Sequence, residues 1–196
     1  PRLGCRTYLA VAGGISVTEV MGSKSTYLRA GIGGFDGRAL KKGDVVKSGE
    51  VSQYIRTFID KLARKATDSS FIQVDWTLMT QAIPIYQSED TVRVTEGRQA
   101  KLFDEKSKDA FYNEAFQISS DSDRMGYRLK GPQLTLKEPK ELVSEGVAFG
   151  SIQVPPDGQP IILMADRQTT GGYPKIGQIA SVDLPKVSQL KPGESI

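Results

Sequence analysis

A short polar loop that follows an apolar strand carries most of the reactive side chains of this sequence. Residues 166–175 place a carboxylate, a guanidinium, an amide, two hydroxyls, two glycines, a phenol and an ammonium directly after the apolar run 160–165. Polar side chains that leave the end of a rigid strand on a glycine-containing loop are a common way to build a site. The alternative is a solvated loop whose glycines only form turns.

A second dense polar stretch, SDSDRMGYRLKG, lies at residues 120–131 and clusters around one glycine. Arginine presents a planar fork of donors that matches carboxylate and phosphate groups, so this stretch suits an anionic or amide substrate. The alternative is an ion pair between Asp123 and Arg124 that only braces the fold.

The types of residue that are missing restrict the chemistry. The 196 residues include no histidine and a single cysteine, Cys5. This excludes Ser-His-Asp and Cys-His catalysis and zinc sites with imidazole ligands, and we expect no metal site. Catalysis would depend on carboxylates, lysine, tyrosine, hydroxyls, backbone amides or a cofactor. With no histidine to activate it, we expect Cys5 to be a small residue of a strand.

The charges argue against nucleic acid and membranes as partners. The 26 basic and 23 acidic residues leave a net charge of +3 and are interspersed along the chain. A nucleic-acid-binding protein needs a basic stripe, and a membrane anchor needs a polybasic or long apolar segment. There is no such segment and no leader pattern, so we expect a cytoplasmic protein, and the single cysteine agrees with a reducing compartment.

The hydrophobic pattern predicts a mainly β protein. Residues 147–154 alternate between apolar and polar, 155–158 read PPDG, and 160–165 are apolar, which predicts a hairpin with one buried strand. Residues 6–12 read as a further strand. Together the patterns indicate about eight short strands and two or three small helices, which favours a barrel or a sandwich.

Three short helices are expected. Apolar residues at three- and four-residue spacing predict an amphipathic helix at 53–65, and a second is expected at 104–112. Asp183, Leu184 and Pro185 have the pattern of a cap and first turn. Pro139 prevents a continuous helix in the segment around it.

A short internal echo suggests two similar halves. The segment LKKGDVV at 40–46 is matched by LKPGESI at 190–196, and each follows a glycine-rich loop. The first of these loops, at 31–34, resembles a phosphate cradle but lacks the lysine and the serine or threonine of a P-loop. We therefore expect its glycines to form tight turns.

Three long stretches carry a family resemblance. They are YLRAGIGGFDGRALKKGD at 27–44, SDRMGYRLKG at 122–131, and the segment 141–194, which begins ELVSEGVAFGSIQVPP. They closely resemble the biotin-dependent carboxyltransferase family, which includes allophanate hydrolase subunit 2, the C subunit of 5-oxoprolinase, the antagonist of the kinase inhibitor KipI and the carboxyltransferase part of urea carboxylase. The match is poorest at 47–90.

The resemblance implies a fold of tandem cyclophilin-like β-barrels with a few short helices. Residues 1–83 would be the remainder of the first barrel with a connecting helix, and 84–196 would be the second barrel. Family members begin with roughly a hundred further residues, about the size of a small domain, so the first barrel is expected to be incomplete.

The resemblance also implies a function. The chain would be one component of a bacterial ATP-dependent 5-oxoprolinase, which opens 5-oxoproline to glutamate. It would act with a sister cyclophilin-like subunit, of the type found in allophanate hydrolase subunit 1 or in the B subunit of 5-oxoprolinase, and with a separate hydrolase-like subunit. ATP would be bound jointly with these partners, because the chain has no complete nucleotide site.

Two alternatives stay open. One is carboxyl transfer from carboxybiotin, carried on another chain, to urea or a similar small amide. The other is a non-catalytic antagonist that binds a kinase-inhibitor partner. Neighbouring genes for a biotin carboxylase or for lactam utilisation would discriminate between the two enzymes.

In the enzyme hypothesis both polar stretches line one cleft for a small polar substrate. Arg124 and Arg167 would hold carboxylate or phosphate, and the backbone amides of Gly171 and Gly172 would stabilise an oxyanion. The predicted catalytic residues are Asp166, Arg167 and Lys175. The predicted substrate-binding residues are Asp123, Arg124, Tyr127, Gln168, Thr169, Gly171 and Gly172. A purely structural role for both stretches is the alternative.

Overall fold

The computed structural model describes residues 4–64, 71–79, 81, 83 and 91–196. By its contact pattern the chain divides into two compact units, one made of residues 1–7 with 79–196 and the other of residues 8–78. The assignment of 1–83 and 84–196 to two cyclophilin-like barrels stays a prediction. The mainly β character with a few short helices is confirmed in the described residues.

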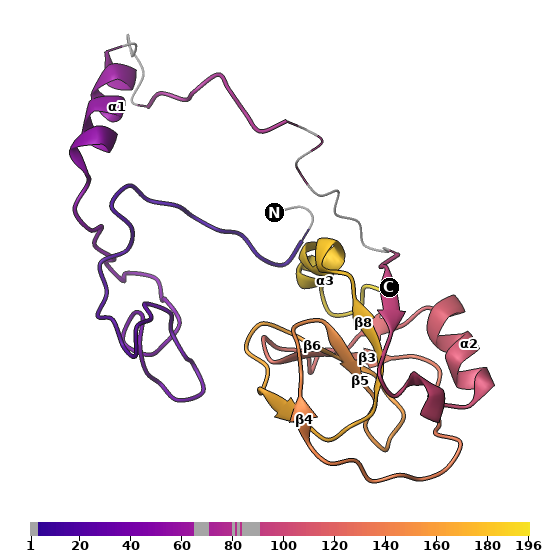
Figure 1. Ribbon diagram of the computed structural model, residues 1–196. Helices are drawn as coiled ribbons and strands as arrows, with labels where there is room; N and C mark the ends of the chain where they lie inside the picture. The colour runs from indigo at the N-terminus through magenta and orange to yellow at the C-terminus, as the bar shows by residue number, and fades with distance from the viewer. Residues whose placement is uncertain (1–3, 65–70, 80, 82, 84–90) are drawn as a thin grey trace. The chain divides into compact units, whose positions relative to one another are not determined.

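The larger unit is built on a six-stranded antiparallel sheet with the order β1-β8-β5-β6-β3-β2 (Figure 1). Its strands are β1 (Val94–Glu96), β2 (Gln117–Ile118), β3 (Gly126–Lys130), β5 (Ser151–Gln153), β6 (Ile161–Leu163) and β8 (Lys175–Ile179). A separate short pair joins β4 (Glu145–Gly146) to β7 (Thr170–Gly171). The strand β7 belongs to the first polar loop, so this pair ties that loop to the segment before β5.

The predicted hairpin is confirmed as β5 and β6. Ile152 pairs with Ile162 across the two strands. The turn closes through Gly158, whose φ is +75° and whose N–H donates to the Pro155 carbonyl at 3.0 Å. The apolar–polar alternation of 147–154 implies a strand with one buried and one exposed face. This implication is wrong for β5, because all of its residues are buried. β5 is an inner strand, hydrogen-bonded to β6 and β8 along its two edges, and side chains on both of its faces are buried.

Side chains from the sheet and from the second helix form the core. The α-helix α2 (Glu105–Asn113) confirms the helix expected at 104–112, and the Asp104 carboxylate caps it by accepting the Ser107 N–H at 2.7 Å. Phe103, Ile162 and Ile176 are fully buried in this core. Short 3-10 helices occupy Ala100–Leu102 (η2) and Ser181–Asp183 (η3).

The last helix, α3 (Leu184–Gln189), begins where the Asp183–Leu184–Pro185 pattern predicted it. Asp183 occupies the predicted N-cap position, but its side chain accepts no hydrogen bond from the helix. Instead its carboxylate accepts from the Arg93 backbone N–H at 2.8 Å and from the Arg93 guanidinium at 2.8 and 2.9 Å. The hydrogen bonds from Arg93 lower the pKa of the buried Asp183 to about 2.

The smaller unit contains α1 (Gln53–Ala63), which confirms the helix expected at 53–65, with residue 65 outside the described residues. None of the residues of α1 is buried. The strand expected at 6–12 is wrong: these residues form no strand, and Tyr8 and Leu9 are exposed. A strand needs a hydrogen-bonded neighbour, which these residues do not find in the described chain. Cys5, also expected in a strand, is exposed outside one.

The internal echo corresponds to one local structure that occurs in each unit. Within residues 40–46, the Asp44 N–H donates to the Lys41 carbonyl at 3.1 Å, and the Asp44 carboxylate accepts the Lys41 N–H at 2.6 Å. Glu194 makes the same two contacts with Lys191, at 3.0 and 2.7 Å. The two segments therefore form the same turn, in which an acidic side chain accepts the backbone N–H of the lysine three residues earlier. The similarity of the whole halves stays a prediction.

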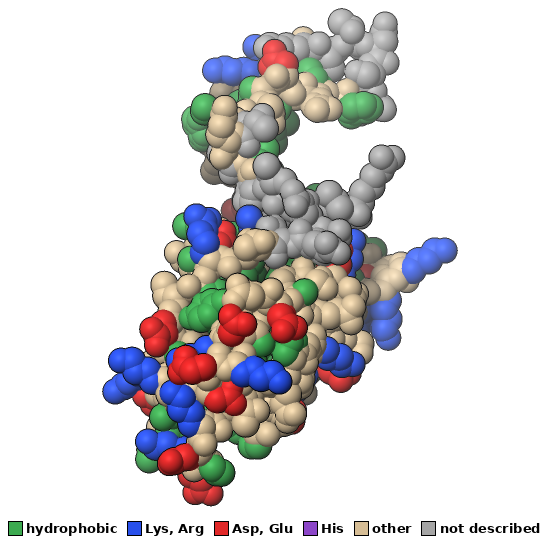
Figure 2. Space-filling model, turned by 90° about the vertical axis from the view of Figure 1, so that its right-hand side faces the viewer, with side chains coloured by type: hydrophobic (Ala, Val, Ile, Leu, Met, Phe, Trp, Pro, Cys, Tyr) green, Lys and Arg blue, Asp and Glu red, His purple; other side chains and the backbone are tan. Residues whose placement is uncertain are grey.

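Charged side chains of both signs are interspersed over the face of the molecule in Figure 2. The surface in view therefore shows no continuous basic stripe. Among the described residues, no helix has the length and apolarity that crossing a membrane requires.

Candidate functional site

The structure joins the two polar stretches through one ion pair. Arg124 precedes β3 and Asp166 follows β6, and these strands are antiparallel neighbours, so the start of one lies beside the end of the other. The Arg124 guanidinium donates to the Asp166 carboxylate at 2.7 Å from Nε and at 3.0 Å from Nη2. The Asp166 N–H also donates to the Arg124 carbonyl at 2.8 Å. This fork is the pairing geometry in which arginine binds carboxylates most strongly.

The Arg124–Asp166 pair is open to a ligand. The side chains are 62% and 41% exposed, so the pair contributes little to stability. The hydrogen bond from Arg124 lowers the pKa of Asp166, which keeps this carboxylate ionised at neutral pH. Asp166 is therefore a fixed hydrogen-bond acceptor and a poor proton donor.

Arg167, the next residue, supplies a half-buried positive charge. Its guanidinium donates to the backbone carbonyls of Val147 and Met164, both at 3.4 Å. In the described part of the chain no acidic side chain forms an ion pair with it. Gln168 and Thr169 follow with exposed side chains, and the Thr169 carbonyl accepts the Val147 N–H at 3.0 Å. An anion that reaches Arg167 would therefore meet a positive charge that is not paired with a carboxylate of the described residues.

Two predicted binding residues serve the fold in this structure. The Asp123 carboxylate accepts the N–H groups of Met125 and Gly126 at 2.8 and 3.2 Å, which closes the turn before β3. Tyr127 alternates into the core, where it is buried, and its hydroxyl donates to the Ser188 carbonyl at 3.2 Å. Burial raises the pKa of Tyr127. The structure therefore does not bring Tyr127 to the Arg124–Asp166 pair.

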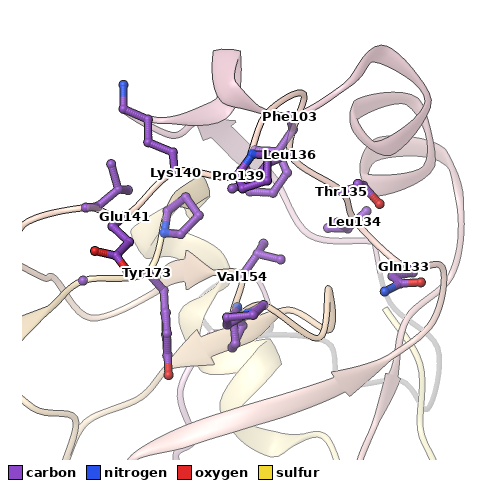
Figure 3. A pocket seen from close by; sticks show the side chains of 15 residues that line it. Phe103, Gln133, Leu134, Thr135, Leu136, Pro139, Lys140, Glu141, Val154 and Tyr173 are labelled. Atoms are coloured by element: carbon purple, nitrogen blue, oxygen red, sulfur yellow. The ribbon is translucent and has the colours of Figure 1, made fainter.

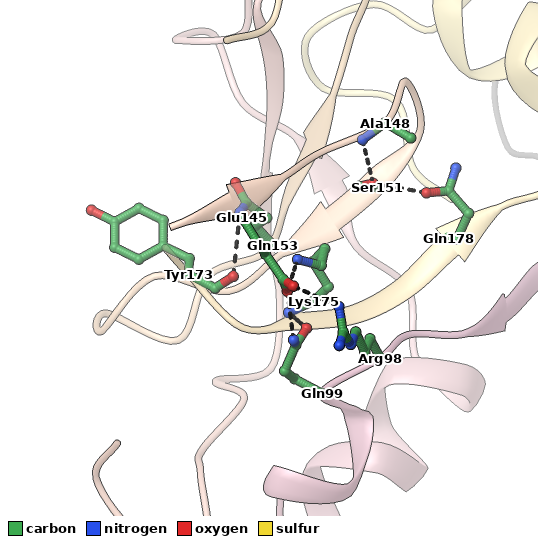
Figure 4. Close-up of polar contacts among 9 residues, drawn as sticks. All are labelled: Arg98, Gln99, Glu145, Ala148, Ser151, Gln153, Tyr173, Lys175 and Gln178. Atoms are coloured by element: carbon green, nitrogen blue, oxygen red, sulfur yellow. Dashed lines mark hydrogen bonds and ion pairs between the residues drawn. The ribbon is translucent and has the colours of Figure 1, made fainter. Parts of the chain in front are cut away.

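Lys175 lies at the other end of the loop, in a polar cluster that the sequence did not reveal (Figure 4). Its side chain is 12% exposed, and its ammonium group pairs with the Glu145 carboxylate. The same carboxylate accepts from the Arg98 guanidinium at 2.8 Å and from the Gln99 amide at 2.6 Å. The hydrogen bond from Lys175, followed by that from Gln99, lowers the pKa of Glu145. Glu145 therefore fixes the position of the Lys175 side chain.

Gly171 and Gly172 are closely packed against the protein on the side where a Cβ would lie. A Cβ at Gly171 would lie 2.7 Å from the amide nitrogen of Gln153, and one at Gly172 would lie 3.2 Å from the Leu142 carbonyl. A side chain at either position would therefore crowd neighbouring protein atoms, while the oxyanion-stabilising role of the two backbone amides stays a prediction. Gln153 is buried, and its amide donates to the Tyr173 carbonyl at 3.2 Å. This hydrogen bond ties the loop to strand β5.

The residues missed from the sequence are Arg98, Gln99, Glu145 and Gln153. Gln153 left a weak signal, since it is a polar residue in the otherwise apolar end of a strand. Glu145 left none, because only the pairing of β4 with β7 places it opposite Gly171 and close to Lys175. Arg98 and Gln99 left none either, because they lie far from both Glu145 and Lys175 in the sequence.

The arrangement suits the binding of a small molecule that is both anionic and amide-bearing. Arg167 offers positive charge, Asp166 offers an ionised acceptor beside it, and Lys175 adds a fixed ammonium at the far end of the loop. Among the described residues no group of three or more His, Cys, Asp or Glu side chains is placed to hold a metal ion.

The glycine loop at 31–37 lies in the smaller unit and closes on itself. A Cβ at Gly34 would lie 1.9 Å from the Thr26 hydroxyl oxygen, and one at Gly37 would lie 1.9 Å from the Gly31 carbonyl oxygen. The expectation that these glycines form tight turns is consistent with this packing. The loop leaves no room at these two positions for the close approach of a phosphate.

Comparison with known proteins places these features in a family. The family model described as carboxyltransferase domain, subdomain A and B, matches residues 1–196. A protein from Escherichia coli, named as the C subunit of 5-oxoprolinase, is 43% identical over 100% of the chain. One of the same name from Haemophilus influenzae is 38% identical over 100% of it. The chain spans 56% of the length of each.

A solved structure supports the same relationship. The crystal structure of the Kluyveromyces lactis urea carboxylase matches with a TM-score of 0.77 at 28% identity. The match covers 99% of this chain and 17% of that chain.

Proposed function

Since this chain belongs to the family of carboxyltransferase domains, subdomain A and B, we propose that it forms part of one component of an ATP-dependent 5-oxoprolinase, which opens the lactam of 5-oxoproline to glutamate. The observation that carries the proposal is the identity of 43% and 38%, over the whole chain, to two proteins named as C subunits of 5-oxoprolinase. The urea carboxylase structure is more distant, at 28% identity.

The geometry of the loop fits this substrate class. 5-Oxoproline carries a carboxylate and a ring amide. In our proposal Arg167 binds the carboxylate, because no protein carboxylate competes for it among the described residues. Asp166, kept ionised by Arg124, accepts a hydrogen bond from the amide N–H. These two contacts on adjacent residues would orient the ring.

Lys175 has an electrostatic role in this proposal. Its ion pair with Glu145 fixes its position, and in this proposal Lys175 stabilises negative charge that develops on the lactam oxygen. Because its pKa is lowered, Asp166 is a weak base. In this proposal it therefore orients the substrate by accepting a hydrogen bond, and general-base catalysis is its lesser role. The predicted catalytic set of Asp166, Arg167 and Lys175 is thus retained, with roles that follow from their partners.

The remaining parts of the enzyme are assigned to partner chains. ATP would be bound jointly, because the glycine loop at 31–37 packs against itself. One partner in this proposal is a sister cyclophilin-like protein, of the type found in the B subunit of 5-oxoprolinase or in allophanate hydrolase subunit 1. The other is a separate hydrolase-like protein. We place the complex in the cytoplasm, in agreement with the absence of a membrane-spanning helix from the described residues.

A reconstituted assay tests the proposal. The full-length protein is purified with its partner subunits, and ATP-dependent formation of glutamate from 5-oxoproline is measured. Loss of a charge-assisted hydrogen bond predicts that Arg167→Ala raises KM by about 10- to 100-fold, and that Asp166→Asn lowers kcat/KM by a similar factor. Arg128→Ala, an exposed arginine on the neighbouring strand, is the matched control and should retain activity. Full turnover by both site variants would refute the assignment.

Carboxyl transfer is the second candidate, and the structural match to urea carboxylase favours it. The same donors would bind urea or a similar amide, and carboxybiotin would arrive on another chain. Turnover that requires bicarbonate and a biotinylated carrier, with no release of glutamate, would replace the first proposal by this one.

A further inference from the structure

A pocket of about 690 Å³ lies in the larger unit and is lined in part by Gly172, Tyr173 and Pro174, near the end of the Asp166 loop (Figure 3). Its floor contains Phe103, Leu134 and Val154, which are all buried side chains. Neither the Arg124–Asp166 pair nor Lys175 lines it. The volume falls within the range of about 300–1,000 Å³ that is typical of small-molecule sites.

The walls of the pocket are stiff. Pro139, Pro155, Pro156 and Pro174 contribute rings on several sides. Proline has a fixed φ, so these walls lose little conformational freedom when a ligand binds. The floor is held by the core, and the Tyr173 carbonyl is fixed by the Gln153 amide at 3.2 Å. The pocket is therefore preformed.

The polar groups are unequally distributed around the apolar middle. Figure 3 shows the Glu141 carboxylate next to Tyr173 at one end and Gln133 and Thr135 at the other, while the Lys140 ammonium extends away from the pocket. In the described part of the chain no basic side chain forms an ion pair with Glu141. The rim therefore offers an acceptor with negative charge and no opposing cation inside the pocket.

We propose that this pocket is a second binding site, for a small molecule with an apolar ring or chain and an amine or amide N–H group at one end. The apolar part lies on Val154 and the surrounding proline rings, and the N–H group donates to Glu141. A ligand with a carboxylate in the same place is disfavoured by the charge of Glu141. The site goes beyond the proposed oxoprolinase reaction and does not depend on it.

Three matched probes test the proposed class. Cyclohexylmethylamine, cyclohexanecarboxamide and cyclohexanecarboxylate share one ring and differ in the head group. Binding to the full-length protein is measured by ligand-observed NMR titration. We expect the amine and the amide to bind with dissociation constants of about 1 mM, in keeping with their small size. The carboxylate should bind about fivefold more weakly than the amine, because Glu141 is exposed and screened.

Variants locate the binding. Thr135→Trp fills one end of the pocket from an exposed position and should weaken all three probes at least about tenfold. Thr95→Trp, the same change on an exposed strand residue outside the pocket, should have no effect. Glu141→Gln should abolish the preference for the amine over the carboxylate, while Glu138→Gln, three residues earlier, should leave it unchanged.

Several outcomes would overturn the proposal. These are no binding of any probe below about 20 mM, equal binding of the carboxylate and the amine to the unaltered protein, or equal binding before and after Thr135→Trp. The comparison with Thr95→Trp separates pocket binding from binding to other exposed apolar side chains.

Discussion

The buried carboxylate of Asp183 gives the sharpest prediction about stability. It connects the start of β1 to the start of α3 through three hydrogen bonds from Arg93, at 2.8 to 2.9 Å. Its pKa falls from an ordinary value of 3.8 to about 2. At ~1.36 kcal/mol for each pH unit, this corresponds to an upper limit of roughly 2 kcal/mol. The Arg93 side chain is 71% exposed, so screening by solvent reduces the expected contribution to about 1 kcal/mol.

The pH dependence has a defined direction. The pKa of Asp183 is lower in the folded than in the unfolded protein, so its contribution is complete above the unfolded value near 3.8 and is lost as the pH falls toward about 2. At pH 7 the free energy of unfolding of Asp183→Asn should therefore be about 1 kcal/mol lower than that of the unaltered protein, so the variant should unfold at lower urea concentration. Between pH 4 and about 2 the variant should lose less stability than the unaltered protein. Urea is the suitable denaturant, because guanidinium ions would screen the pair.

Asp121→Asn is the matched control for this experiment, because Asp121 is an exposed carboxylate in a loop of the same unit. It should leave both the stability at neutral pH and the acid response unchanged. The reasoning is refuted if Asp183→Asn has the stability of the unaltered protein at pH 7, or if both lose the same stability between pH 4 and about 2.

Two further substitutions probe local packing. Gly158→Ala should lower the free energy of unfolding by about 1–2 kcal/mol, since φ is +75° and a Cβ would lie 2.4 Å from Gln133 Cγ. Gly146→Ala, where a Cβ meets open space, should change it little in the same urea titration. Ser107→Ala removes the acceptor for the Thr135 N–H at 2.7 Å, and should cost about 1–2 kcal/mol by thermal unfolding. Unchanged unfolding of Ser107→Ala would show that water replaces the hydroxyl there.

Local signals in the sequence predicted the fold well. The PPDG turn, the helix expected at 104–112 and the apolar periodicity that predicted a helix at 53–65 each depend on neighbours within a few residues, and each was confirmed in the described residues. The strand expected at 6–12 failed because alternation in one segment says nothing about whether a partner strand is available. Burial on both faces of β5 was missed for a similar reason, since it depends on segments distant in the sequence that pack above and below the sheet.

The candidate site was predictable in part. Both polar stretches were identified from composition, and the ion pair between Arg124 and Asp166 joins them, although the sequence had suggested Asp123 as the partner of Arg124. The position of Asp166 beside Arg124 follows from the pairing of β3 with β6. The cluster around Glu145 depends on the register of β4 against β7, which no local pattern encodes.

The ion pair between Arg124 and Asp166 has a consequence for how the two loops respond to a ligand. A molecule that binds to Arg124 or to Asp166 must compete with the two hydrogen bonds that join these side chains, at 2.7 and 3.0 Å. Occupation of the loop after β6 therefore also concerns the loop before β3, because the ion pair joins a side chain from each of them.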